Sequence, residues 1–283
     1  MQHIEFFDID HFENNYHRVK PVDELSLFID FFWETKFDSL LQQYPDGFSD
    51  ALFPNIGYTY LINLGTPFTM QVDEEKYEMK TDGFLPRHKA IECYHQKGNR
   101  LFGIKFKVSP VIFEKRINFS EYRNYIFPLT YLLDRVIISE IKSASDFETR
   151  VGILTQYFSG IVKKHSEPLP SIRIVTEILE ECNTTNSFDI PVKLLADKYE
   201  ISTRTLQRYF ESHTSLSSKK ALQILRIRKA THHLATSPLD FHYSLYGYYD
   251  HSHFYKHLKS FLQKSTLQKL QPHLKLLEKL HHQ

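Results

Sequence analysis

Glycine is scarce in this sequence, with 9 among 283 residues. The phosphate-binding loops of nucleotide-dependent enzymes need closely spaced glycines, so the composition argues against that class. No apolar run approaches the roughly 20 residues that a membrane-spanning helix needs. The first residues also lack the basic start and the apolar block of a secretory signal. The two cysteines, Cys93 and Cys182, cannot build a disulfide framework. These absences predict a cytoplasmic protein with no membrane partner.

Charge is distributed unevenly along the chain, although the net charge of the whole is only +1. From Ser166 onward there are 16 Lys and Arg against 11 Asp and Glu, which gives +5, while the preceding part has 19 against 23, which gives −4. A basic part joined to an acidic part is typical of a nucleic-acid-binding module attached to a separate domain. The polar segment 163–170 carries two prolines, so we expect domains at 1–165 and 166–283.

The N-terminal part combines strand-like and helix-like segments. β-Branched or aromatic stretches bounded by turn residues predict strands at 58–64, 68–72, 76–79 and 101–108. Apolar residues at helical spacing predict helices at 24–33, 111–116, 129–141 and 146–164. Short strands at this density favour a small sandwich or a cupin-like barrel. Such a domain could hold a small ligand in its mouth and dimerise through its helices, or it could be a filled core without a ligand.

A metal-dependent barrel of the cupin kind would need His-x-His followed by Glu, because three converging ligands hold the ion. The stretch from His88 supplies Glu92 but has Ala90 where the second histidine would stand, and His95 has the wrong spacing. Cys93 lies close to His95, but nothing in the sequence positions a base or supplies an oxyanion hole, so we interpret it as a buried, inert thiol. We expect no catalytic residue, no metal and no cofactor.

The basic C-terminal part contains a helix-turn-helix pattern at about 190–212. A helix is predicted over 171–182, and Ile190 to Ser202 then reads as a second helix and a turn. Ser202 suits the N-cap of the next helix, in which Leu206 and Phe210 face inward. The side chains predicted to face outward from this helix are those of Thr203, Arg204, Gln207 and Arg208. Arg can bind guanine and Gln can bind adenine in the major groove of DNA.

A second copy of this pattern follows at about 240–262. A long helix is predicted over 217–235, and Ser237-Pro238 ends it. The segment 241–246, a turn at Gly247 and a helix over 250–261 then repeat the first unit. In this last helix the inward positions are taken by Phe254, Leu258 and Phe261, and the outward positions by His251, Ser252, Tyr255 and Lys256.

The two copies together resemble the DNA-binding module of the AraC/XylS family of transcription regulators. The first half of the family signature is present as Ala196, Ser202, Arg204, Leu206, Arg208, Phe210, Arg226, Ala230 and Leu234. The second half is present as Gly247, Asp250, His251, Ser252, His253, Phe254, Lys256 and Phe261. The resemblance covers about residues 170 to 270. The N-terminal part resembles the β-rich sensor domains of the same family through the segments 31–33, 61–65 and 103–106.

The resemblance implies an α+β protein: a β-rich sensor-type domain with helices, followed by an all-α domain with two helix-turn-helix units on one connecting helix. These units would enter successive major grooves, about 34 Å apart along one face of the DNA. The residues implied to contact DNA are Ser202, Thr203, Arg204, Gln207, Arg208, His251, Ser252, Tyr255 and Lys256. We expect Arg208 to bind a base, whereas His253 has a structural or phosphate-binding role and Arg226 braces the module.

The sequence departs from the family pattern at several positions. Glu200 and Ser215 stand where the first unit usually has Gly, and Ser218 stands where Pro is common. In the second unit Tyr243 replaces a small Ala, so it must push the helices apart or turn outward. Gln263 and Thr266 replace the Gly and Pro that usually close the motif. We expect sequence specificity to depend mainly on the first unit.

The sequence therefore predicts a sequence-specific, DNA-binding transcription regulator controlled by a ligand or partner at its N-terminal domain. Its expected partners are double-stranded DNA, a small-molecule effector, a second copy of the chain, and RNA polymerase if the protein is an activator. Two alternatives stay open. The N-terminal domain could serve only for dimerisation, or it could be a metal-dependent, cupin-like enzyme domain fused to the DNA-binding module.

Overall fold

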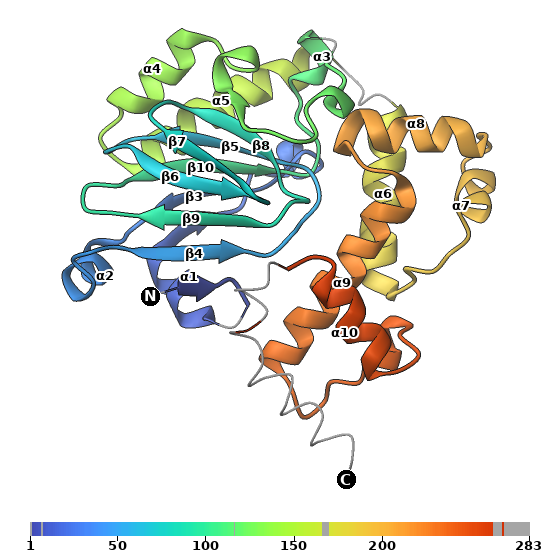
Figure 1. Ribbon diagram of the computed structural model, residues 1–283. Coiled ribbons are helices and arrows are strands. Elements are labelled where there is room, and N and C mark those ends of the chain that lie inside the picture. The colour runs from blue at the N-terminus through green and yellow to red at the C-terminus, as the bar shows by residue number, and fades with distance from the viewer. Residues whose placement is uncertain (1, 7, 116, 166–169, 263–267, 269–283) are drawn as a thin grey trace.

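The computed structural model describes residues 2–6, 8–115, 117–165, 170–262 and 268. Figure 1 shows a β-rich N-terminal part, coloured blue to green, beside a helical C-terminal part, coloured yellow to red. The N-terminal strands form two sheets, and helices cover one of them. This arrangement confirms the predicted fold class and selects the sandwich from the two β architectures.

The first sheet has five strands in the order β1-β4-β9-β6-β7. Strand β1 pairs in parallel with β4, and the remaining neighbours are antiparallel. β1 lies at the edge of this sheet, beside β4. The strands are β1 (Gln2–Ile4), β4 (Phe48–Leu52), β9 (Ile91–His95), β6 (Phe68–Val72) and β7 (Glu75–Met79).

The second sheet has six strands in the order β11-β8-β5-β10-β3-β2. Its central strands are buried on both faces, because successive side chains point to opposite sides of a strand. In β10, for example, Phe102 and Ile104 face the helices, while Leu101 faces the other sheet. The strands are β11 (Phe127–Pro128), β8 (Gly83–Pro86), β5 (Tyr58–Asn63), β10 (Leu101–Phe106), β3 (Ile29–Thr35) and β2 (Tyr16–Val19).

The predicted helix at 24–33 is wrong. Only the 3₁₀ turn η1 (Asp23–Leu25) is helical there; residues 26–28 form a turn, and β3 begins at Ile29. β3 sends Phe32 toward the helices and Trp33 toward the other sheet, and apolar residues on both faces of a strand imitate a helical pattern. Gly103 of β10 makes room for Trp33, since a Cβ atom there would lie 2.4 Å from the indole ring.

The other N-terminal helices surround the two sheets. The predicted helix over 146–164 is present as α5, with Asp146 as its N-cap, and α4 packs against it. The predicted helix at 129–141 begins later, at Arg135, after a 3₁₀ turn. The elements are α1 (Ile9–Asn15), α2 (Asp38–Gln43), α3 (Ile112–Lys115), η2 (Phe119–Glu121), η3 (Leu129–Tyr131), α4 (Arg135–Ser143) and α5 (Phe147–Lys164).

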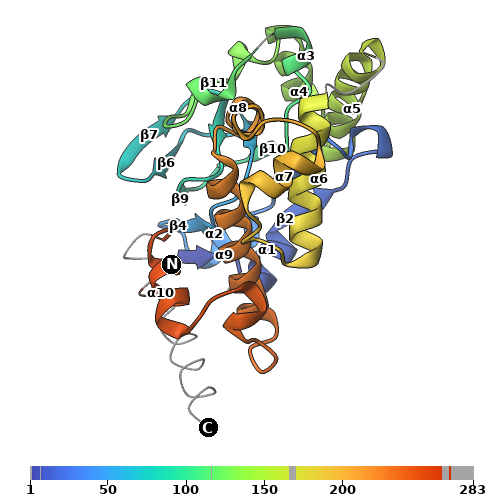
Figure 2. The same ribbon diagram turned by 90° about the vertical axis from the view of Figure 1, so that its right-hand side faces the viewer.

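The C-terminal part consists of helices that share one apolar core. Figure 2 shows α9 running through this part, with α8 near its upper end and α10 near its lower end. The elements are α6 (Pro170–Thr185), α7 (Val192–Lys198), α8 (Thr203–Thr214), α9 (Ser218–Thr236), η4 (Tyr243–Tyr246) and α10 (His251–Lys259). Within the described ranges, no helix has both the length and the apolar character needed to cross a membrane.

Candidate nucleic-acid interface

Helix α8 begins where the sequence predicts. The Ser202 hydroxyl accepts a hydrogen bond from the Thr205 backbone N–H at 3.0 Å, which is the N-cap bond expected at a helix start. Leu206 and Phe210 are fully buried, because they lie four residues apart on the face that meets the module core. This packing leaves Ser202, Thr203, Arg204 and Arg208 exposed at the beginning and along the outer face of the helix. A polar, cationic helix face of this kind suits a DNA groove.

Gln207 differs from the other predicted contact residues of α8, because its side-chain amide is already engaged. Its Nε2 donates to Glu211 Oε1 at 2.8 Å. Its Oε1 accepts from both the backbone N–H and the hydroxyl of Ser218, each at 3.4 Å. Gln207 therefore joins α8 to the start of α9 in this structure, and a contact with a base would require these bonds to be exchanged.

The residues that replace glycine in the first unit adopt the backbone conformation that glycine favours. Glu200, in the turn between α7 and α8, has φ 54°, and Ser215, after α8, has φ 60°. Both angles lie in the left-handed region, where a Cβ atom costs roughly 1–2 kcal/mol. Both turns therefore have a left-handed residue at a position where glycine would carry no steric cost.

Helix α10 presents the predicted contact residues of the second unit. Asp250 caps it by accepting from the His253 backbone N–H at 2.6 Å. Phe254 and Leu258 are fully buried against the module core. Ser252 and Lys256 are exposed, whereas His251 and Tyr255 are half-buried and stack with ring centroids 6.2 Å apart. The outer face of α10 is thus less open than that of α8.

The first half of the second unit is shorter than the pattern predicts. Residues 243–246 form the single 3₁₀ turn η4 where the first unit has the α-helix α7. Tyr243 is half-buried, and its ring lies 4.4 Å from the His242 ring. Where the family pattern predicts a helix with a small residue at the helix crossing, the second unit has a single 3₁₀ turn that carries the large ring of Tyr243. Gln263 and Thr266, the two positions at the end of the family motif, lie outside the residues that the structure describes.

Arg226 of α9 joins the two units. Its Nη1 lies 2.9 Å from Asp189 Oδ1, which precedes α7, and its Nη2 donates to the carbonyl of Gly247 in the turn before α10. Its guanidinium carbon also lies 3.9 Å from the centroid of the Tyr248 ring. The prediction that Arg226 braces the module is confirmed by these contacts. The 19 residues of α9 span about 28 Å at 1.5 Å per residue, which is close to one turn of DNA.

The N-terminal domain contacts this module at α8 and α9. The 3₁₀ turn η2 packs against α8, and the last residues of α8, including His213 and Thr214, are buried. On α9, Arg228 forms an ion pair with Glu5, with 2.6 Å between Nη2 and Oε1. Sequence reasoning missed this pair, because no local pattern relates two residues that lie 223 positions apart.

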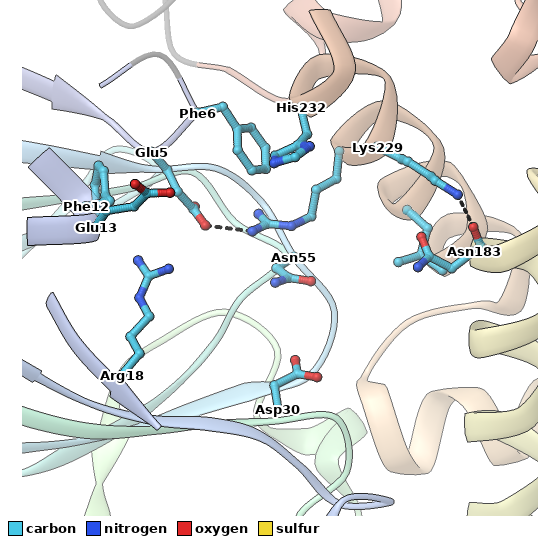
Figure 3. A pocket seen from close by; sticks show the side chains of 12 residues that line it. Glu5, Phe6, Phe12, Glu13, Arg18, Asp30, Asn55, Asn183, Lys229 and His232 are labelled. Atoms are coloured by element: carbon cyan, nitrogen blue, oxygen red, sulfur yellow. Dashed lines mark hydrogen bonds and ion pairs between the residues drawn. The ribbon is translucent and has the colours of Figure 1, made fainter. Parts of the chain in front are cut away.

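A cavity of about 520 Å³ lies beside this pair, between the two domains. Figure 3 shows its side chains converging from the N-terminal strands and from α9. Both charge signs and several apolar groups are represented in the lining, which consists of Glu5, Phe6, Phe12, Glu13, Arg18, Asp30, Asn55, Asn183, Leu225, Arg228, Lys229 and His232. Burial and the charge of Arg228 both lower the pKa of His232.

The histidines considered for a metal site lie in different surroundings. His95 is buried, with its Nδ1 2.6 Å from Asn99 Oδ1 and its Nε2 3.1 Å from Asp50 Oδ2. His88 instead lines a separate groove with Lys89, and burial lowers its pKa to about 4. In the part of the chain that the structure covers, no three His, Cys, Asp or Glu side chains are grouped as metal ligands. Burial raises the pKa of the Cys93 thiol.

Residues 195–268 match a family model described as a helix-turn-helix domain. Among solved structures, ToxT from Vibrio cholerae O395 bound to (E)-4-(8-methylnaphthalen-1-yl)but-3-enoic acid is 11% identical, with 93% of this chain and 98% of that chain covered and a TM-score of 0.44. ToxT from Vibrio cholerae strain SCE256 with bound unsaturated fatty acid is 12% identical, with coverage of 87% and 90% and a TM-score of 0.42. The AraC-like transcriptional activator CuxR is 10% identical, with coverage of 78% and 88% and a TM-score of 0.27.

No curated protein matches the sequence. The matched family model covers both recognition helices, α8 and α10, together with the connecting helix α9. The resemblance drawn from the sequence signature is thereby confirmed for the C-terminal part. Residues 195–268 of the C-terminal part therefore form an AraC-type helix-turn-helix domain.

Proposed function

We propose that α8 and α10 enter successive major grooves of double-stranded DNA, and that α8 supplies most of the base recognition. The observation that carries the proposal is the pair of capped helices at the two ends of α9, of which α8 exposes Arg204 and Arg208. A guanidinium binds the O6 and N7 atoms of guanine through two hydrogen bonds. Ser202 and Thr203, at the start of α8, lie where helix N-termini contact phosphate. Gln207 binds a base once its bonds to Glu211 and Ser218 are exchanged.

The second recognition helix contributes more to affinity than to specificity. Lys256 is exposed and forms the phosphate contact, because an ammonium group is a point charge without the geometry of a guanidinium. Ser252 is the exposed polar side chain nearest the start of α10 and contacts the adjacent backbone. His251 and Tyr255 stack on each other and form the apolar side of this contact.

The boundary between the sensor domain and the DNA-binding domain lies at residues 165 and 166 in this proposal. α5 ends at Lys164 and α6 begins at Pro170, so the boundary falls between two helices that belong to different parts. The N-terminal domain controls the module and does no catalysis. Homodimerisation and contact with RNA polymerase are further parts of the proposal, and they follow from the family resemblance alone.

A small-molecule effector would bind in the cavity between the domains. Phe6, Phe12 and Leu225 offer it an apolar surface, and Arg18 offers an exposed guanidinium at the side of the same cavity. This lining suits an amphipathic acid whose carboxylate pairs with Arg18. Binding of oleate to the full chain, measured by calorimetry, should weaken in Arg18→Gln. If Arg18→Gln binds oleate as tightly as the unchanged chain, Arg18 does not contact the carboxylate.

DNA selected from a random pool provides the cognate site for the main test. Arg208→Ala should then cost about 1–3 kcal/mol of binding free energy on that site and relax the preference at one base. Arg173→Ala is the matched control, because Arg173 is an exposed arginine of α6 outside both units. If Arg208→Ala weakens binding to cognate and random DNA equally, Arg208 contacts only phosphate. If the chain selects no sequence, the proposed function is wrong.

A further inference from the structure

The groove that contains His88 is a second cavity between the two domains, separate from the one beside Glu5. Its volume is about 760 Å³, which is within the range of small-molecule sites. Three cationic side chains line it and come from distant segments: Lys89 follows β8, Arg123 follows η2, and Lys220 lies in the first turn of α9. Positive charge from both domains is therefore concentrated at one groove.

Lys220 has no acidic partner among the described residues. Its side chain is half-buried, and its ammonium nitrogen lies 4.1 Å from the centroid of the Phe261 ring. Burial lowers the pKa of Lys220, and no described carboxylate offsets this effect. A cation that is partly removed from water without a counter-ion reduces the stability of a folded chain, and such groups are concentrated at binding sites.

Two carboxylates share the groove, but they do not neutralise all three cations. Asp73 accepts from Lys89 Nζ at 2.8 Å and from the Ala90 backbone N–H at 3.3 Å, so its charge is paired with a single lysine. Glu74 is exposed, and within the described ranges no ion pair joins it to a cation of the groove. Lys220 and one further cation are thus left for an anion from outside the chain.

The surplus of positive charge is felt at His88. Burial and the charges of Lys89, Lys220 and Arg123 lower the pKa of this histidine to about 4, and the Asp73 carboxylate offsets only part of the effect. The Nδ1 atom of His88 is buried and has no hydrogen-bond partner in the part of the chain that the structure covers. A neutral imidazole beside three cations binds a proton more readily once a negative group enters the groove.

The chemistry of the lining indicates the kind of anion. A phosphate monoester carries nearly two negative charges at pH 7 and three acceptor oxygens, which suits several cations better than one carboxylate does. Leu216 and Phe261 line the same groove next to Lys220 and give it an apolar side. An organic group attached to the phosphate can pack on that side.

We propose that this groove binds a small phosphate monoester whose phosphate group contacts Lys89, Arg123 and Lys220. The organic part of the ligand packs on Leu216 and Phe261. This site goes beyond the proposed function, because it adds a second class of ligand at a second place between the domains. DNA also offers phosphate groups, but the walls of the groove belong to both domains, and a small molecule fits between them more readily than the backbone of a duplex.

Calorimetric titration of the full chain with phenyl phosphate is the first test, with inorganic phosphate and benzoate as comparison ligands. Phenyl phosphate should bind about tenfold more tightly than either, because benzoate has a single negative charge and inorganic phosphate has no ring to bury on Phe261. Equal binding of phenyl phosphate and inorganic phosphate would overturn the organic part of the proposal. Absence of saturable binding at millimolar phenyl phosphate would overturn all of it.

Lys220→Met keeps the apolar stem on Phe261 and removes only the charge. It should weaken phenyl phosphate binding about tenfold, as expected for one charged hydrogen bond. Its free energy of unfolding should not fall, because the charge that is lost has no partner in the described structure. Lys219→Met is the matched control at the neighbouring, exposed position, and its affinity should stay within about twofold of the unchanged chain.

Bound phosphate should also raise the pKa of His88, since a nearby negative charge favours the protonated ring. The ring-proton NMR signal of His88, identified by its loss in His88→Gln, follows this protonation with and without saturating phenyl phosphate. We expect the midpoint to move upward by about one pH unit or more. An unchanged midpoint would show that the phosphate binds elsewhere on the chain.

Two further results would contradict the proposal. A fall in the stability of Lys220→Met, with phenyl phosphate binding unchanged, would make Lys220 a structural residue. Weaker binding of Lys220→Met to cognate DNA, again with unchanged phenyl phosphate binding, would assign this cation to the DNA interface instead. The test of Arg208→Ala on cognate and random DNA is independent of both results.

Discussion

Arg226 stacks on Tyr248, with 3.9 Å between the guanidinium carbon and the ring centroid, while its Nη1 holds Asp189 at 2.9 Å. Asp189 precedes the first helix-turn-helix unit and Tyr248 lies in the turn of the second. One side chain of the connecting helix therefore fixes both units at once. The position of the two recognition helices relative to each other therefore depends on the contacts of Arg226 as well as on the apolar core.

Replacing Arg226 with methionine should destabilise the DNA-binding module by about 2–3 kcal/mol. The change keeps a long apolar stem but removes a buried cation and its stacking contact, and it leaves the Gly247 carbonyl without its donor. Chemical denaturation followed by far-UV circular dichroism measures the loss. Asp189→Asn is the control for the charge alone and should cost less, because Asp189 is 64% exposed. Equal stability of Arg226→Met and the unchanged chain would refute the bracing role.

Glycine in place of Glu200 should stabilise the module by about 1 kcal/mol. Glu200 has φ 54° in the turn between α7 and α8, and glycine adopts this left-handed conformation without steric cost. Glu200→Ala is the informative control, because alanine keeps the Cβ atom and should bring no gain. Ser215→Gly should gain less than Glu200→Gly, since Ser215 is buried and its hydroxyl donates to the Thr214 carbonyl at 2.6 Å. A similar gain from alanine at position 200 would exclude backbone strain as the cause.

Removal of the Lys256 charge should make DNA binding less sensitive to salt. A single phosphate contact releases about one counterion, so the slope of log affinity against log salt should shrink by about 0.9 in Lys256→Ala. Lys163→Ala, an exposed lysine on α5 of the N-terminal domain, should leave the slope unchanged. Binding at four or more salt concentrations on one DNA site gives both slopes. An unaltered slope in Lys256→Ala would show that Lys256 does not contact phosphate.

The stability of the module should fall between pH 6.5 and 4 because of His213. Burial lowers the pKa of this histidine to about 4, from about 6.5 in an unfolded chain. Between these values the unfolded state binds the proton and the folded state does not, so the free energy of unfolding decreases as the pH falls through this window. His213 is 7% exposed, and the full effect is about 3 kcal/mol.

Denaturation at pH 7 and at pH 4.5 tests this expectation. His213→Gln can still reach the Ser171 hydroxyl, which lies 2.9 Å from His213 Nε2, and it should remove most of the pH dependence attributed to this residue. His253→Gln, at an exposed position of α10, serves as the control. Burial lowers the pKa of His257 to about 4 as well, so part of the slope should remain in His213→Gln. An unchanged slope in this variant would contradict the prediction.

The parts of the fold that the sequence predicts correctly are those whose structure depends on contacts between residues close together in the chain. The Ser202 cap, the buried pair Leu206 and Phe210, and the long helix after Ser217 all follow from hydrogen bonding and spacing within a few residues. The strand over 68–72 likewise has the predicted bounds. In contrast, β4 was missed because it carries polar residues inward: Asp50 is fully buried, and His11 and His95 from other elements bind its carboxylate.

The sequence by itself determined the two capped recognition helices and the connecting helix of the C-terminal module, because capping residues and an apolar repeat specify these helices through local contacts. Only the tertiary structure decided how those helices are constrained. The engagement of Gln207 by Ser218, the reduction of the second unit to one 3₁₀ turn, and the pairing of Glu5 with Arg228 each join segments whose proximity exists only after folding. Contacts between distant segments depend on the packing of whole domains, which no local pattern encodes.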